Sequence, residues 1–242
     1  MQKKYTQTDQ VIEAMRCQGG YATLACLYQV VNTSSWGTKT PQESIRRIVQ
    51  KSAAFFRIEP GLWALEECRE KVLIKFSLQE RTAENLEIFT HGYYQGLITE
   101  IGHMRHYLTY VPAQDQHRMF IDKPLIEVCD TIQLPAFSYP YLINRARTVD
   151  AIWFNGRGMP DSMFEVEHST DIQNSITKFC DLQDFNCRFF IVAAESRYEQ
   201  FKKIVNRTAF KDIKNRVSFS SYEAIVKQYN ALCILNATQN GI

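Results

Sequence analysis

The chain has 242 residues, 45% of them hydrophobic and 12% aromatic, enough to bury a core as one large domain or two modest ones. Its 28 basic and 26 acidic residues give a formal net charge of +2, which excludes a basic field over the whole chain, so any DNA-binding surface must be local. Low-complexity tracts and internal repeats are absent, which excludes solenoids.

Seven cysteines, with no CxxC pair and no zinc-type spacing, indicate reduced thiols in a cytosolic chain. The opening MQKKYTQTDQ lacks the apolar core of a signal peptide, and no run of about 18 apolar residues is present to span a bilayer. No glycine-rich phosphate loop of the Walker or Rossmann type is found. We therefore expect a cytoplasmic protein with no membrane association and no nucleotide cofactor.

Residues 1–70 have the pattern of a winged helix-turn-helix domain. Apolar residues at helical spacing predict helices over 6–18, 21–34 and 39–52. Two short apolar strands follow in AFFRIEPGLWALEE, around a Glu59-Pro60-Gly61 turn. Three helices closed by a small hairpin make this fold.

The third of these helices has favourable chemistry at its start. Thr40 is expected to be its N-cap, Pro41 suits the first helical position, and Glu43 completes a capping box. Its apolar residues form one stripe, and polar and basic residues occupy the other faces.

The words WGTKTPQESIRRIVQ and FFRIEPGLWAL resemble winged-helix modules found beside bacterial restriction enzymes and in some eukaryotic chromatin proteins. The resemblance implies binding to double-stranded DNA, with the third helix in the major groove and the wing on the backbone. The DNA-contacting residues predicted on that basis are Thr40, Gln42, Arg46, Arg47 and Lys51. The alternative is a protein-interaction or dimerisation module.

Residues 71–90 are polar and helix-compatible and are expected to form a connector, and 91–242 a second domain. Its first segment has helical character broken by Gly92, Gly96 and Gly102, followed by a strand in LTYVPAQD. Segment 113–147 is poorly patterned. From 148 the pattern predicts, in order, a strand, a turn, a strand, a helix over 170–184, strand RFFIVAA, a helix over 197–209, strand RVSFSS and helix SYEAIVKQYNAL. We expect an α/β (α+β) domain with a central mixed sheet flanked by helices.

Three acids fall within the first two of these strands, in TVDAIWFNGRGMPDSMFEVEHST. If the hairpin pairs symmetrically about residues 157 and 158, Asp150 lies opposite Glu165, and strand alternation places Glu167 on the same face. Opposed, half-buried like charges are destabilising unless something compensates them. A divalent metal ion does so, because hard cations bind carboxylate oxygens. The alternative is an ordinary salt bridge to Arg145, Arg147 or Arg188.

TVDAIWF followed by MFEVEHST is similar to the signature of the PD-(D/E)xK nuclease superfamily, an Asp followed by (Asp/Glu)-x-Lys. Asp150, Glu165 and Glu167 fill it, with Glu167 in the place of the usual lysine, as in some type II restriction endonucleases. The resemblance implies a restriction-endonuclease-like fold, cleavage of DNA, and Mg²⁺ as cofactor, with Mn²⁺ as a possible substitute. It also implies a bacterial origin and a homodimer acting on a palindromic site.

Two further residues are site candidates through the same resemblance. Lys178, in the helix after the second strand, can return the missing positive charge, and Glu100, in the preceding helix, can join Asp150 and Glu165 as a metal ligand. Their alternatives are a solvated lysine and an exposed helical acid. Asp161 follows a proline but is expected in the turn, so it is not assigned as the motif acid.

Three functional hypotheses remain open from the sequence. The first is a sequence-specific type II restriction endonuclease that hydrolyses phosphodiester bonds of double-stranded DNA. The second is a non-enzymatic winged-helix regulator whose acids form salt bridges. The third is a modification-dependent or DNA-repair nuclease.

Overall fold

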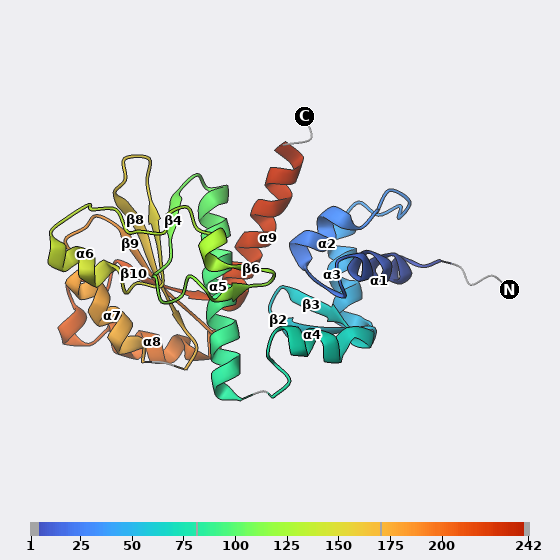
Figure 1. The fold of residues 1–242 in the computed structure, drawn as a ribbon, viewed down its shortest axis with the longest axis horizontal. Coiled ribbons are helices and arrows are strands. Elements are labelled where there is room, and N and C mark those ends of the chain that lie inside the picture. The colour runs from blue at the N-terminus through green and yellow to red at the C-terminus, as the bar shows by residue number, and fades with distance from the viewer. Residues whose placement is uncertain (1–4, 81, 170, 240–242) are drawn as a thin grey trace. The chain divides into compact units, whose positions relative to one another are not determined.

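The computed structural model describes residues 5–80, 82–169 and 171–239 (Figure 1). The chain divides into two compact units, one made of the residues up to Thr82 and those from Asn230 onward, the other of Ala83–Tyr229. Across the described ranges, no helix is long and apolar enough to cross a membrane.

The first unit packs helices against a three-stranded antiparallel sheet with strand order β1-β3-β2. The expected hairpin is present, and Gly61 in its turn has a φ of +84°, which a residue without Cβ adopts freely. Apolar side chains from all three expected helical regions form the core, among them Val11, Leu27 and Ile45. The elements are α1 (Gln7–Cys17), β1 (Tyr21–Thr23), α2 (Leu24–Val30), α3 (Pro41–Lys51), β2 (Phe55–Glu59), β3 (Leu62–Leu65) and α4 (Arg69–Lys75).

Two local expectations for this unit are wrong. Tyr21–Thr23 is a strand that pairs with β3, so the second helix begins only at Leu24, where the Thr23 hydroxyl accepts the backbone N–H of Cys26. Thr40 occupies the N-cap position of α3 but its side chain makes no capping bond, and the capping box is found at α1, between Thr6 and Asp9.

The second unit is built on a five-stranded sheet with strand order β10-β9-β8-β7-β4. Strands β8, β9 and β10 are parallel, whereas β7 is antiparallel to both of its neighbours. This confirms a mixed sheet flanked by helices. The elements are α5 (Ala83–Met104), β4 (Leu108–Tyr110), α6 (Pro140–Ala146), β7 (Ala151–Phe154), β8 (Pro160–Glu167), α7 (Ile172–Asp181), β9 (Arg188–Ala193), α8 (Tyr198–Val205), β10 (Val217–Ser221) and the first part of α9 (Tyr222–Gln239), whose residues from Asn230 onward belong to the first unit.

Helices cover both faces of this sheet (Figure 1). One face carries Ile152, Met163 and Ile191, which pack with buried residues of α6, α7 and α8. On the opposite face the Trp153 indole N–H donates to the carbonyl of Ile98 in α5. Because adjacent strand residues alternate between faces, each strand contributes to two separate apolar layers.

Helix α5 is continuous, so the expectation that its glycines break it is wrong. They mark close approaches instead. A Cβ on Gly96 would lie 2.1 Å from the ring of Phe120, and one on Gly102 would lie 2.5 Å from Thr109. Gly96 therefore lets the 113–147 segment pack directly on the helix, in a short hairpin formed by β5 (Met119–Phe120) and β6 (Lys123–Pro124).

Candidate active site

The β7–β8 hairpin has the register that the sequence predicts. Ala151 pairs with Phe164 and Ile152 with Met163, so Asp150, the residue before β7, stands beside Glu165. One oxygen of Asp150, Oδ2, accepts the backbone N–H of Val166 at 2.7 Å. That bond fixes the Asp150 carboxylate at the end of the hairpin.

Asp161 was expected in the turn, and this expectation is wrong. It is the second residue of β8. The register shifts between Trp153 and Phe154, and Phe154 pairs with Pro160, which leaves Asp161 at the irregularity. Its carboxylate forms an ion pair with Arg188. Asp161 thus sits at the opposite end of β8 from Glu167.

The three predicted acids are all buried: Asp150 is 7% exposed, Glu165 2% and Glu167 4%. Burial, reinforced by the nearby charges of Asp150 and Glu167, holds the pKa of Glu165 well above its usual range although Lys178 acts in the opposite direction. The Ser175 hydroxyl lies 3.1 Å from an oxygen of Glu165 and also contacts Glu167. A hydroxyl has one proton, so it donates to one carboxylate at a time.

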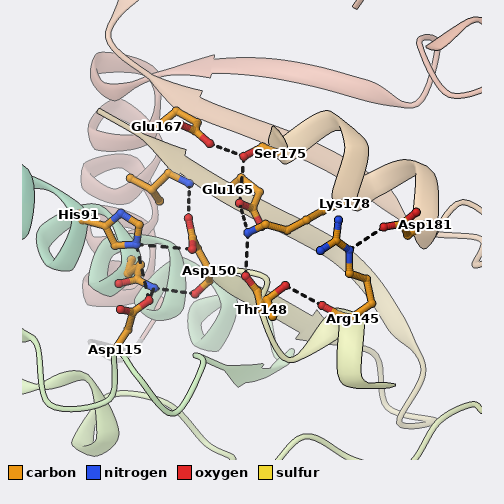
Figure 2. A network of polar contacts seen from close by, with 12 residues as sticks. His91, Asp115, Arg145, Thr148, Asp150, Glu165, Glu167, Ser175, Lys178 and Asp181 are labelled. Carbon is orange, nitrogen blue, oxygen red and sulfur yellow. Dashed lines mark hydrogen bonds and ion pairs between the residues drawn. The ribbon is translucent and has the colours of Figure 1, made fainter. Parts of the chain in front are cut away.

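Lys178 reaches into this cluster from helix α7 (Figure 2). Its Nζ lies 2.6 and 2.8 Å from the two oxygens of Glu165, and it also donates to the carbonyl of Thr148 at 2.8 Å. Asp171 begins the helix by accepting the backbone N–H of Gln173, and Ser175 and Lys178, three residues apart, share the face that meets the strand end. The structure therefore brings Lys178 together with Glu165.

Glu167 pairs with an arginine that the sequence did not single out. Arg197 has its Nη1 4.0 Å from Glu167 and donates to the carbonyl of His168 at 3.1 Å. The arginines considered from the sequence lie elsewhere: Arg145 pairs with Asp181, and Arg188 with Asp161. Glu167 is thus held on both sides, by Ser175 and Arg197.

Two residues that sequence reasoning missed adjoin Asp150. His91 of α5 places its Nε2 3.6 Å from Asp150 Oδ1 and 3.7 Å from Asp115 Oδ2. Gln95, one turn later, donates to both Asp115 Oδ2 and the carbonyl of Asp150, at 2.9 and 2.8 Å. Burial alone would lower the pKa of His91, but its contacts with Asp115 and Asp150 outweigh burial and raise the pKa to about 9.

A hollow of about 660 Å³ is lined by His91 and by the three predicted acids, Ser175 and Lys178. Six acidic side chains face it, against the cations of Arg118 and Lys178 and the imidazole of His91. The acids are Glu84, Glu87, Asp150, Glu165, Glu167 and Asp171. The hollow therefore carries an excess of negative charge.

Glu100 does not line this hollow. It lies nine residues beyond His91 on α5, which is about 13 Å along the helix axis and half a turn around it. Among the residues that the structure describes, the group with three possible metal-binding atoms within 4.8 Å of one another consists of His91, Asp115 and Asp150. Of the predicted ligands, Asp150 belongs to that group, and Glu165 lies beside it.

The residues of the hollow lie within a part of the chain that matches a known protein family. Residues 73–241 match the family described as "Type II restriction enzyme NmeDI C-terminal domain". The chain is also 27% identical over 161 residues to "Type II restriction enzyme NmeDI" of Neisseria meningitidis serogroup C, an alignment that covers 62% of this chain and 45% of that protein. No solved structure matches significantly. Since the family match spans well over half of the 242 residues and includes every residue of the hollow, the chain belongs to the NmeDI C-terminal domain family of type II restriction enzymes.

Proposed function

We propose that this protein is a sequence-specific type II restriction endonuclease that hydrolyses phosphodiester bonds of double-stranded DNA with Mg²⁺, for which Mn²⁺ can substitute. The observation that carries the proposal is the meeting of Asp150, Glu165 and Lys178 at the end of one hairpin, inside the region matched to the restriction-enzyme family. Their order and spacing are those of a PD-(D/E)xK site in which a helix supplies the lysine.

The donor set fits a hard divalent cation. Asp150 and Glu165 offer carboxylate oxygens, and burial together with the neighbouring acids raises the pKa of Glu165 despite Lys178, so a further cation would stabilise its charged form. A DNA phosphate entering a hollow with six acidic side chains would be repelled. A cation bound by Asp150 and Glu165 would compensate the charge of Glu165 and reduce the repulsion of the DNA phosphate.

When bound, the ion would supply Lewis acidity toward the scissile phosphate and increase the acidity of a nearby water. The residues of the chain position this chemistry. Val166 N–H orients Asp150, Ser175 orients Glu165, and Lys178 presents a positive charge at the carboxylate, where it can also meet the charge that develops on the phosphate.

Replacing Lys178 by methionine tests the helix-borne cation. We expect the cleavage rate at saturating Mg²⁺ to fall about 10²- to 10³-fold with DNA affinity largely kept, because the lost charge acts on the transition state. Single-turnover cleavage and a binding assay in Ca²⁺ measure the two effects. Lys202→Met, on the exposed surface of α8, is the matched control, and a Lys178→Met rate near that of the control would remove Lys178 from the site.

We also propose that the first unit is a winged helix that binds the DNA. In α3, Ile45 and Val49 are buried, whereas Arg46, Arg47 and Lys51 are exposed, as is Thr40 before the helix, and Gln42 is half-buried. A helix with one buried stripe and exposed cations fits insertion into a major groove, with the β2–β3 hairpin as the wing.

Substituting both Arg46 and Arg47 with alanine should weaken DNA binding and flatten its salt dependence. The slope of log affinity against log salt is expected to fall by nearly two, since each lost phosphate contact removes about 0.9. Titrations at several NaCl concentrations give the slope. The double variant Lys202→Ala plus Lys203→Ala removes the same charge from α8, and equal slopes for the two variants would assign α3 to protein contacts.

Purified protein incubated with plasmid DNA and Mg²⁺, with and without EDTA, tests the proposed function. Discrete fragments that require the metal are expected, together with a homodimer by light scattering, because a palindromic site presents two equivalent strands. A smear of fragments would favour a repair nuclease, and cutting restricted to methylated DNA a modification-dependent enzyme. Binding to unmethylated or methylated DNA without cleavage of either would favour the hypothesis of a non-enzymatic winged-helix regulator.

A further inference from the structure

We propose that His91, Asp115 and Asp150 form a second divalent-metal site, which favours Mn²⁺ or another transition-metal ion and shares Asp150 with the carboxylate site. Its existence rests on geometry that is independent of Glu165 and Lys178. Its role beside the scissile phosphate rests on the proposed function.

The spacing of the three groups suits one ion. The Nε2 of His91 lies 3.6 Å from Asp150 Oδ1 and 3.7 Å from Asp115 Oδ2, and the three ligand atoms fall within 4.8 Å of one another. Ligands about 2.1 Å from an octahedral ion lie about 3 Å apart when adjacent and about 4.2 Å apart when opposite. The two observed separations exceed the adjacent value by about 0.6–0.7 Å, so the His91 and aspartate atoms would close in slightly on an ion bound between them.

The same separations are too long for hydrogen bonds. The Nε2 atom of His91 is buried and has no hydrogen-bond partner among the residues described, although it points between two carboxylates. A buried nitrogen that forms ion pairs with two carboxylates, but lies too far from either for a hydrogen bond, leaves room for an atom between them. That is the second observation, besides the grouping itself, that favours a ligand here.

The neighbouring contacts hold the ligands in place while leaving these atoms available. Asp150 uses Oδ2 for the backbone N–H of Val166, so Oδ1 remains toward His91. Asp115 is 2% exposed and has Oδ1 2.7 Å from the Arg118 Nε, which leaves Oδ2 on the His91 side with Gln95. Gln95 thereby ties the Asp115 loop to Asp150, as supporting residues do around metal ligands.

The donor chemistry sets the preference for the ion. Mg²⁺ and Ca²⁺ are bound almost entirely through oxygen, whereas imidazole nitrogen suits transition metals. One imidazole with two carboxylates therefore selects Mn²⁺ over Mg²⁺ more strongly than Asp150 and Glu165 do. An imidazolium that only neutralises the two aspartates is the competing explanation.

Isothermal titration of the full chain with Mn²⁺ alone, without DNA, tests the site. His91→Asn is expected to bind one Mn²⁺ fewer per chain, or to bind that ion at least tenfold more weakly, whereas His117→Asn behaves as wild type. His117 is an exposed histidine two residues from Asp115, so it is a matched control. Unchanged stoichiometry and affinity in His91→Asn would overturn the proposal in favour of the counter-ion explanation.

A second measurement uses Glu165→Gln protein labelled at its histidine rings, in which Mn²⁺ binding at the carboxylate site is weakened. Substoichiometric Mn²⁺ should broaden the NMR signals of His91 before those of His117, and equal broadening would overturn the proposal. Both experiments report binding without cleavage. If His91→Asn weakens Mn²⁺ binding but the wild-type protein cuts no DNA, the metal site stands and the nuclease proposal is refuted. If the wild-type protein cuts DNA but its Mn²⁺ binding does not depend on His91, the nuclease proposal stands and the metal site is refuted.

Discussion

Asp150→Asn should reduce DNA cleavage by at least about 10³-fold, to the limit of detection. The substitution keeps the size of the side chain but removes the negative charge of Asp150, which acts on Glu165 and pairs with His91. It also places an amide where Oδ2 accepts the Val166 N–H, so one of the two orientations of the amide loses that bond. Single-turnover cleavage with Mg²⁺ and with Mn²⁺ measures the effect.

Asp161→Asn is the matched control for this prediction. Asp161 is an aspartate of the same hairpin, yet its partner is Arg188 and it stands at the far end of β8 from Glu167. Its replacement should leave the cleavage rate within about threefold of wild type, since an exposed ion pair contributes about 0–1 kcal/mol. An active Asp150→Asn protein beside an inactive Asp161→Asn protein would reassign the motif acid.

Glu165→Gln should be inactive and at the same time more stable than wild type near pH 8 in EDTA. Glutamine keeps an oxygen for Lys178 and Ser175 but carries no charge, so it loses metal affinity and also the cost of ionising a group that is 2% exposed. Active sites often hold such destabilising groups. For a chain of this size, each kcal/mol gained raises the melting temperature by about 2–4 °C.

The stability difference should depend on pH in a defined direction. The pKa of Glu165 is raised in the folded state, so its protonated form stabilises the fold at low pH, and that contribution is lost as the pH rises through the folded-state pKa. Glutamine has no such loss. The melting temperatures of the two proteins should therefore converge near pH 4 and separate with increasing pH.

Glu199→Gln, at an exposed position of α8, is the control for both parts of this prediction. It should leave activity unchanged and show no pH-dependent gain in melting temperature. A Glu165→Gln protein that melts below wild type at pH 8 would mean that the ion pair with Lys178 outweighs the burial cost. An active one would remove Glu165 from the proposed metal site.

The sequence predicts the acidic hairpin well because strand alternation has a fixed period of two. Once the pairing of residues 151–153 is symmetric, the neighbouring position of Asp150 and Glu165 follows. The register shift beyond Trp153 escaped prediction, because a bulge adds one residue without changing the apolar alternation enough to reveal it. Asp161 was therefore placed in the turn rather than in the strand.

The other half of the hollow was not predictable from local pattern. Helix α5 is buried on most sides through its middle, so periodicity gives no indication that His91 rather than Glu100 meets the strand end. Asp115 lies in a loop with no periodicity, and the following hairpin packs closely on α5 where Gly96 meets Phe120. Contacts between residues far apart in the sequence produce no repeating pattern. Isolated glycines and isolated polar residues are the only local signs of them, and such residues are common for other reasons.

The Gln95 amide links the loop of Asp115 to the end of the hairpin, because it donates to both Asp115 and the carbonyl of Asp150. The charged groups that it assembles are distributed along the chain from His91 to Lys178, and the parallel strand β10 completes the sheet only near residue 221. In the proposed nuclease, the candidate site would therefore be complete only after residues from His91 to Lys178 have been synthesised and have folded together.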